Sequence, residues 1–292
     1  MTTNAEIERQ ALHHSQLFTH LSHWDEVWKA AMEVVGDRDI AVGLGLDQLG
    51  LLGPRGVSLA LDRLIANANG QELRCVLELG SGFGGALRHA EQNLKSRGIH
   101  PLLIGVEIVW QHCQVAKMIG QAMGDVGPAI VQGDVGCLPI RSASIDAVFA
   151  AGSASHFRSV GDVARESHRV LRPGGVFVMI DEVSLRPAGA PPLSEDFLVY
   201  HPYFQMATPE ERRSQIESAG LTIVAFESLA AWGAALLRQR AEAMRFLGAC
   251  AQQVYGAEES ESIIATLKSA AHEFGSGGIQ PTLIVARRLS ES

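Results

Sequence analysis

The segment that most constrains the fold is VLELGSGFGG, which spans residues 76–85. It begins as an apolar run typical of a buried strand and leads directly into a glycine-rich turn. Gly80, Gly82 and Gly84 can adopt positive φ angles and have no Cβ, so a ligand can lie against the backbone of this turn. Glu78 adds a carboxylate two positions before the first glycine. The segment therefore predicts a strand followed by a turn that holds a nucleotide-like cofactor.

The glycine turn alone is compatible with two classes of cofactor. Gly80, Gly82 and Gly85 also match the dinucleotide pattern G-x-G-x-x-G letter for letter. Glu107 follows at roughly the 20-residue interval expected of a ribose-binding carboxylate. Other parts of the chain must therefore decide between a nicotinamide dinucleotide and a different nucleoside cofactor.

Composition limits the functions open to this chain. Its 292 residues are 47% hydrophobic and 19% charged, which is typical of a globular protein with a substantial core. The formal net charge is −8, and no run of Lys or Arg forms a basic stripe. Phosphate-backbone binding therefore has little electrostatic support, and we expect no nucleic-acid partner.

Cysteine usage and hydropathy favour a cytoplasmic protein. The four cysteines are widely spaced, with no C-x-x-C pair and no His at metal-ligand spacing, so they are predicted to be reduced core thiols rather than metal ligands. Residues 1–9 lack the basic start and apolar stretch of a secretory signal, and no apolar run is long enough to span a bilayer. We expect neither a metal site nor a membrane partner.

Strand and helix signals alternate from residue 73 onward, which predicts an α/β fold with a largely parallel sheet and helices on both faces. Five strands are expected in the first part of this region, at residues 74–79, 101–107, 129–132, 145–150 and 175–181, and two more at 221–226 and 282–286. Helices are expected between them, at residues 84–96, 110–123 and 160–170, and a long helical stretch at 230–274. The carboxyl ends of the parallel strands are where ligands bind in such folds.

The regions outside this core are predicted from local signals. Residues 5–35 have mostly helical apolar spacing, and Gly36 is expected to end this helical region. The histidines within it fit a surface helix better than a ligand set. Thr208, Pro209 and Glu211 form a capping-box signature for a helix that reaches Ala219. The predicted organisation is an N-terminal helical cap at 1–71, a cofactor-binding core at 72–184, a substrate lid loop at 185–207, and a C-terminal part of the core with a helical insertion at 208–292.

Four stretches, in order, resemble the S-adenosylmethionine-dependent methyltransferases with the Rossmann-like fold. The resemblance is to the small-molecule branch that includes sterol, tocopherol and natural-product enzymes. The four stretches are VLELGSGFGG at 76–85, IGVEIVW at 104–110, QGDVGCLPIRSASIDAVFA at 132–150 and RVLRPGGVFVMID at 169–181. The resemblance implies a seven-stranded sheet whose last strand is antiparallel, flanked by helices, with an N-terminal helical region and a helical lid insertion.

The resemblance and the charges together favour S-adenosyl-L-methionine over a nicotinamide. S-adenosylmethionine carries an ammonium and a sulfonium that a carboxylate such as Glu78 can balance, whereas a nicotinamide enzyme needs no acid before its glycines. No dehydrogenase set such as Tyr-x-x-x-Lys is present. The cofactor is therefore expected to be S-adenosyl-L-methionine.

By resemblance, each part of the cofactor has candidate ligands in this chain. Gly80, Gly82 and Gly84 would line the methionine end, and Glu78 would reach its amino group directly or through water. Glu107 would hold both ribose hydroxyls, since a carboxylate can accept from two neighbouring donors. The adenine would pack on Ile108 and contact Asp134 and the Val135 amide. Asp134 is alternatively a loop-capping aspartate.

The loop after the fourth strand, AAGSASHFRS, is the expected approach to the transferred methyl group. Gly152, Ser153, Ala154 and Ser155 stand here where the family often has a Glu or a similar polar residue. His156 is a candidate general base, because an unperturbed imidazole pKa of about 6.5 suits proton transfer near neutrality. A histidine bonded to the backbone at a helix start is the alternative. His201 is a second base candidate, with a plain loop histidine as its alternative.

The predicted function is methyl transfer to O, N or C of a hydrophobic small molecule, in natural-product biosynthesis. Aromatic residues in irregular segments, such as the stretch FLVYHPYF at 197–204, support a hydrophobic acceptor. Asp181 and Glu182 are either substrate contacts or solvated loop acids. Two alternatives stay open, namely a methyltransferase-fold enzyme that catalyses another reaction, such as cyclisation, and a non-catalytic binding protein. A homodimer is also left open.

Overall fold

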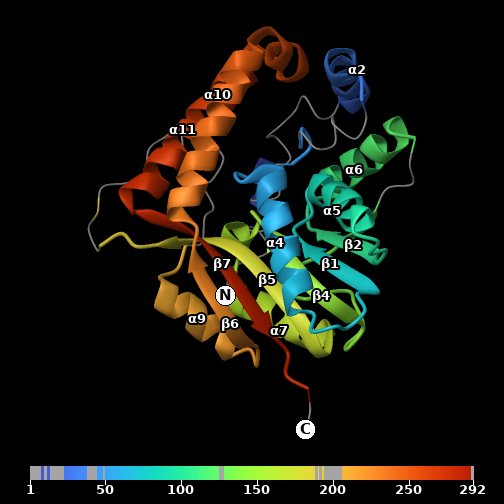
Figure 1. Cartoon of the computed structure of the whole chain (residues 1–292), viewed down its shortest axis with the longest axis vertical. Coiled ribbons are helices and arrows are strands. Elements are labelled where there is room, and N and C mark those ends of the chain that lie inside the picture. The colour runs from blue at the N-terminus through green and yellow to red at the C-terminus, as the bar shows by residue number, and fades with distance from the viewer. Residues whose placement is uncertain are drawn as a thin grey trace.

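The computed structural model describes residues 8–9, 12–13, 23–37, 45–48, 50–124, 128–187, 190, 193 and 206–290. Seven strands form one sheet in the order β3-β2-β1-β4-β5-β7-β6 (Figure 1). Only β7 runs antiparallel to its neighbours, β5 and β6. The predicted seven-stranded sheet with an antiparallel last strand is therefore confirmed. The strands are β1 Cys75–Leu79, β2 Leu102–Glu107, β3 Ala129–Gln132, β4 Ile145–Ala151, β5 Leu171–Ser184, β6 Thr222–Ser228 and β7 Ile279–Arg287.

The centre of the sheet is buried on both faces. Val178 and Ile180 of β5 belong to a different apolar cluster from Phe177 and Met179, because successive side chains of a strand point to opposite faces. This explains why the strands read as continuous apolar runs rather than as alternating ones.

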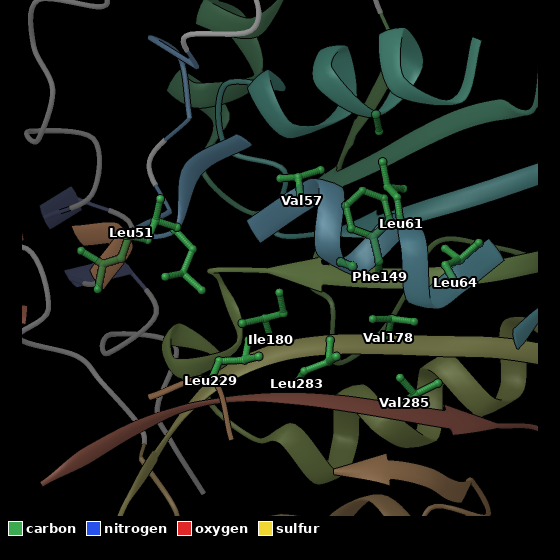
Figure 2. Close-up of a cluster of buried hydrophobic side chains, with 14 of the residues drawn as sticks. Leu51, Val57, Leu61, Leu64, Phe149, Val178, Ile180, Leu229, Leu283 and Val285 are labelled. Atoms are coloured by element: carbon green, nitrogen blue, oxygen red, sulfur yellow. The ribbon is translucent and has the colours of Figure 1, made fainter. Parts of the chain in front are cut away.

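Helices cover both faces of the sheet. On one face lie α4 (Gly53–Asn67) and α5 (Gly85–Ser96), together with parts of α10 (Ala230–Tyr255) and α11 (Ala257–Ser276). On the other face lie α7 (Val160–Val170) and α9 (Pro209–Glu217). Figure 2 shows Leu61 and Val57 of α4 above Phe149 of β4 and Val178 of β5. Outside these layers, α2 (Trp24–Val35) packs on α6 (Trp110–Ala122) through an apolar cluster that includes Val27 and Ile119.

Strand β1 lies between β2 and β4, and this places the predicted site. The chain leaves β1 toward β2 on one side and later returns to β4 on the other. Crossovers that run in opposite directions open a crevice at the carboxyl ends of the two central strands. The turn that follows β1 and the loop that follows β4 therefore meet at one edge.

Several local predictions are confirmed. Gly36 ends α2 in the left-handed region, with its N–H donating to the Met32 carbonyl. The capping box of α9 is complete, because Glu211 N donates to Thr208 Oγ1 at 3.2 Å and Thr208 N donates to Glu211 Oε2 at 2.9 Å.

Three predictions need correction. The stretch at 230–274 is two helices rather than one, because Gly256 breaks it with φ 86° and ψ 159°, a conformation open essentially only to glycine. These two helices, α10 and α11, form a hairpin that projects beyond the sheet (Figure 1). Strand β5 extends from Leu171 to Ser184, well beyond the predicted 175–181. Among the cysteines, Cys137 is exposed and Cys113 is half-buried, so these two free thiols are not core thiols, whereas the half-buried Cys75 packs against the core.

No helix among the described residues is both long and apolar enough to cross a membrane.

Candidate cofactor and active site

The glycine turn after β1 has the backbone that the sequence predicts. Gly80, Gly82 and Gly84 have φ angles of 69°, 52° and 77°. A Cβ on Gly80 would lie 2.8 Å from Ser153 Cβ, and one on Gly84 would lie 2.8 Å from Ile130 Cδ1. These two glycines are thus required by the chain's own packing as well as by their φ angles. The turn is held to β2, because Gly80 N and Ser81 N both donate to the Val106 carbonyl.

The next glycine, Gly85, makes room for a segment from the N-terminal region. A Cβ at Gly85 would lie 2.5 Å from Asp47 Oδ1. Asp47 in turn forms a buried ion pair with Arg88 of α5, with Arg88 Nε donating to Asp47 Oδ2 at 2.7 Å. Arg88 also donates to the Phe83 carbonyl inside the turn. The residues at 45–48 therefore pack against the start of α5, next to the glycine turn.

Glu78 lies at the end of β1, before the turn, and one of its carboxylate oxygens lacks a hydrogen-bond donor among the described residues. Its side chain is only 3% exposed, and among the described residues Oε2 has no hydrogen-bond partner. Burial, followed by the nearby Glu107 carboxylate, raises the pKa of Glu78 well above its ordinary value, while Arg88 acts in the opposite direction. A buried acceptor without a donor is costly, so a cationic donor bound here would offset that cost. The ammonium group of an amino acid fits this requirement.

Glu107 ends β2 and is fixed by backbone donors. Gly82 N donates to Oε2 and Val109 N donates to Oε1, each at 2.8 Å. Burial alone would raise the pKa of Glu107. His112 and these two N–H groups outweigh that effect and lower the pKa below its ordinary value. The carboxylate is therefore held ionised, and in this form both oxygens act only as acceptors and form stronger bonds with hydroxyl donors.

The three adenine candidates, which follow β2 and β3, differ in their surroundings. Ile108 is 39% exposed, which leaves an apolar surface beside Glu107. Asp134 performs the loop-capping role that was its alternative, since Oδ1 accepts from Gly136 N at 2.8 Å and Oδ2 pairs with Arg158. Val135 is half-buried against the core. A contact of Asp134 and Val135 with adenine stays a prediction.

The loop after β4 is fastened to the sheet at two points. Ser153 Oγ donates to the Leu79 carbonyl at the end of β1, at 2.7 Å. Ser155, in the 3-10 helix η2 (Ala154–His156), donates to Glu182 Oε2 at 2.8 Å. His156 is half-buried at the end of η2, and its backbone N–H donates to the Ser153 carbonyl. The predicted base is thus held by this loop at the carboxyl edge of the sheet, whereas His201 lies outside the described residues.

The acids Asp181 and Glu182 are buried in β5, so the alternative of solvated loop acids is wrong. Asp181 pairs with Arg212 of α9 at 2.5 Å. Burial raises the pKa of Asp181 to about 6 and that of Glu182 to about 7, and for Glu182 the neighbouring Asp181 adds to the effect. The strand continues through both residues because it pairs with β7 up to Ser184.

Two tryptophans outside the strands are packing residues. Trp28 packs against the cluster between α2 and α6, and Trp232 packs against the main core. Sequence reasoning missed Asp47, Arg88 and His112. Their partners are set by tertiary packing, and no local motif marks them.

Comparison with known proteins agrees with this architecture. Residues 77–179 match a family model described as a methyltransferase domain. Phosphoethanolamine N-methyltransferase 2 of Haemonchus contortus, solved with phosphomonomethylethanolamine and S-adenosylhomocysteine, superposes with a TM-score of 0.67 at 16% identity. That match covers 80% of this chain but only 52% of the nematode chain, so this chain spans about half the length of that protein.

Two further solved structures share the fold. Geranyl diphosphate C-methyltransferase from Streptomyces coelicolor A3(2), solved with Mg²⁺, geranyl diphosphate and S-adenosylhomocysteine, gives a TM-score of 0.61 at 17% identity, over 80% of this chain and 78% of that chain. The [4+2]-cyclase SpnF gives 0.58 at 19% identity, over 82% and 81%.

The sheet order, the antiparallel β7 and the glycine turn after β1 define the class as a Rossmann-like methyltransferase fold. Within it, residues 77–179 match the methyltransferase domain family. The resemblance found in the sequence to the S-adenosylmethionine-dependent methyltransferases is thereby confirmed. The predicted cofactor is of the same kind as the S-adenosylhomocysteine held by two of the similar structures.

Proposed function

We propose that this chain binds S-adenosyl-L-methionine at the carboxyl ends of β1 and β2 and transfers its methyl group to O, N or C of a hydrophobic small molecule. The observation that carries the proposal is the pair of buried carboxylates, Glu78 and Glu107, on either side of the glycine turn. Glu107 could bind the ribose of either class of cofactor, so the distinction rests on Glu78. A pyrophosphate brings no donor to Glu78 Oε2, which lacks a partner among the described residues, whereas an ammonium group can donate to it.

The chain's own residues would bind each end of the cofactor. Glu78 Oε2 would accept from the amino group, and the free lone pairs of Glu107 would accept from the ribose hydroxyls. Ile108 would support the adenine, with Asp134 and the Val135 amide at its edge. When bound, the cofactor supplies an activated methyl group.

The remaining task of the protein is to align the acceptor and exclude water. The loop after β4, fastened by Ser153 and Ser155, supplies a rigid edge for this alignment. If the acceptor is a hydroxyl, His156 removes its proton, with His201 as a second base. An amine or carbon acceptor that arrives already nucleophilic needs no base.

The hydrophobic acceptor and the biological setting rest on sequence. Support for the acceptor comes from the aromatic stretch at 197–204 within the proposed lid, 185–207. One similar structure was solved with geranyl diphosphate and another with phosphomonomethylethanolamine, so the fold favours neither acceptor class. We place the protein in natural-product metabolism in the cytoplasm, with no nucleic-acid or membrane partner.

The cofactor is tested by calorimetry with S-adenosylhomocysteine. Gly82→Val should abolish binding, because a branched side chain is strained at φ 52° and fills the space beside the main chain. Gly98→Val is the matched control, since Gly98 also has a positive φ, of 72°, but no atom within 4 Å of its Cβ position. Equal binding by both variants, or preference of the wild type for NAD, would contradict the proposal.

Methyl transfer is tested with labelled cofactor and panels of hydroxyl, amine and carbon acceptors. For a hydroxyl acceptor, His156→Ala should slow turnover at least about tenfold and leave the affinity for S-adenosylhomocysteine unchanged. Unchanged turnover of such an acceptor would remove His156 from the mechanism.

The fold shared with SpnF keeps cyclisation as a second candidate function. A cyclase would convert its substrate without forming S-adenosylhomocysteine. A non-catalytic binding protein, the third reading, would show no turnover of any acceptor in the panels.

A further inference from the structure

His112 connects the two parts of the candidate cofactor site. The imidazole is 5% exposed, in the first turn of α6, where it lies beside Glu107 at the end of β2. Its Nδ1 is 3.6 Å from Glu107 Oε1. The ring also packs edge-on against Phe83 of the glycine turn, with ring centroids 4.6 Å apart. One side chain thus contacts both the turn and the carboxylate.

Glu107 has few other partners that could orient it. Its two backbone donors, Gly82 and Val109, occupy one lone-pair position on each oxygen. Among the residues that the structure describes, His112 is the one basic side chain within ion-pair distance of this carboxylate. A carboxylate has about four acceptor positions. With His112 as a third donor, on Oε1, the position that stays free to accept from the ribose is on Oε2.

We propose that His112 is a positioning residue for cofactor binding, which fixes the Glu107 carboxylate relative to Phe83 of the glycine turn so that the free position on Oε2 faces the ribose. The inference rests on the proposed function, because it takes Glu107 as the ribose ligand. The Nδ1–Oε1 separation is slightly longer than a hydrogen bond, and such contacts often tighten when the ligand binds. His112 therefore acts through Glu107 and does not itself touch the cofactor.

The proposal is distinguished from simple packing by two substitutions at one position. His112→Phe keeps an aromatic ring against Phe83 but removes the donor. His112→Asn keeps a donor close to the place of Nδ1 but removes the ring. We expect the Phe variant to bind S-adenosylhomocysteine about tenfold more weakly, the size of one lost hydrogen bond to a charged group, and the Asn variant to stay within about threefold of wild type.

A ligand without ribose hydroxyls separates this effect from general damage. For the 2′,3′-dideoxy analogue of S-adenosylhomocysteine, wild type and His112→Phe should bind equally. His89→Phe is the matched control, because His89 is a half-buried histidine of α5 that bonds Ser58 away from Glu107. It should leave both affinities unchanged.

A measurement on the wild type keeps the test independent of the variants' folding. The ¹⁵N resonance of His112 Nδ1 should shift on titration with S-adenosylhomocysteine and not with the dideoxy analogue. The inference is overturned by equal losses for both ligands, by His112→Phe binding like wild type, or by an Nδ1 resonance that responds to both ligands alike. Wild type that binds neither ligand would instead overturn the proposed function, and the inference with it.

Discussion

At the scale of single residues, Glu182 is a buried carboxyl group, and its neighbour in sequence, Asp181, is a second buried acid. Burial, followed by Asp181, raises its pKa from 4.5 to about 7. Between these values the folded chain holds a proton that the unfolded chain has lost. The contribution of Glu182 to the free energy of unfolding is therefore fully present below pH 4.5 and is lost as the pH rises through about 7.

Glu182→Gln should remove this titration. Between pH 5 and pH 8, the variant should lose less free energy of unfolding than wild type does, by roughly 2 kcal/mol. Urea unfolding at the two pH values measures the difference. Ser155→Ala is the control, because it removes the hydrogen bond to Glu182 but keeps the titrating group. Parallel pH profiles for wild type and Glu182→Gln would show that the acid is not protonated in the fold.

Residues whose role is encoded locally could be predicted from the sequence. The positive φ angles of Gly80, Gly82 and Gly84 follow from the glycine pattern alone. His112 could not be found in this way, because its role depends on a strand end and a turn that meet only in the fold. Asp134 combines a local and a tertiary role. Its loop-capping bond could be predicted from the sequence, but its pairing with Arg158 could not.

At the scale of elements, the segment at 50–53 crosses the loop after β4 at very close range. A Cβ on Gly152 would lie 2.9 Å from Gly50 Cα, and Gly152 itself has a φ of 101°. Two backbones can approach this closely only where neither carries a side chain on the facing side.

Gly152→Ala should therefore destabilise the protein by about 3 kcal/mol, from both the backbone conformation and the clash. Gly70→Ala is the matched control. Its φ is 76° and no atom lies within 4 Å of its Cβ position, so it should cost only about 1 kcal/mol. Thermal or urea unfolding measures the loss of stability in the two variants. Equal losses would mean that the backbones at Gly50 and Gly152 can move apart without a cost in free energy.

Elements defined by apolar runs and helix signals were predicted nearly to the residue, such as β3 and α7. The ends of β5 were not, because its pairing with β4 and β7 extends the strand past the apolar run into Asp181 and Glu182. Acids at a strand end usually indicate a loop. Here Arg212 and Ser155, distant in sequence, compensate them.

At the scale of the whole molecule, two arginines join the residues at 45–48 and 50–51 to the rest of the protein. Arg88 pairs with Asp47, and Arg240 of α10 donates to the carbonyls of Gly50 and Leu51. The Arg88–Asp47 pair is almost completely buried, so removal of one partner leaves an uncompensated charge.

Arg88→Met should cost about 3 kcal/mol of unfolding free energy, whereas the double variant Asp47→Leu/Arg88→Met should cost clearly less. Urea unfolding of wild type, both single variants and the double variant completes the cycle. Costs that simply add would show that the pair does not interact and that the N-terminal segment is held by other contacts.

The position of β7 has a kinetic consequence. This strand lies between β5 and β6, and its residues pair with partners as early as Val176. The first five strands can assemble through short crossovers as the chain is synthesised, but β6 reaches the sheet only after β7 has been made. Such pairing across a long stretch of sequence is slow, so we expect the β6 edge to be the last part of the sheet to fold.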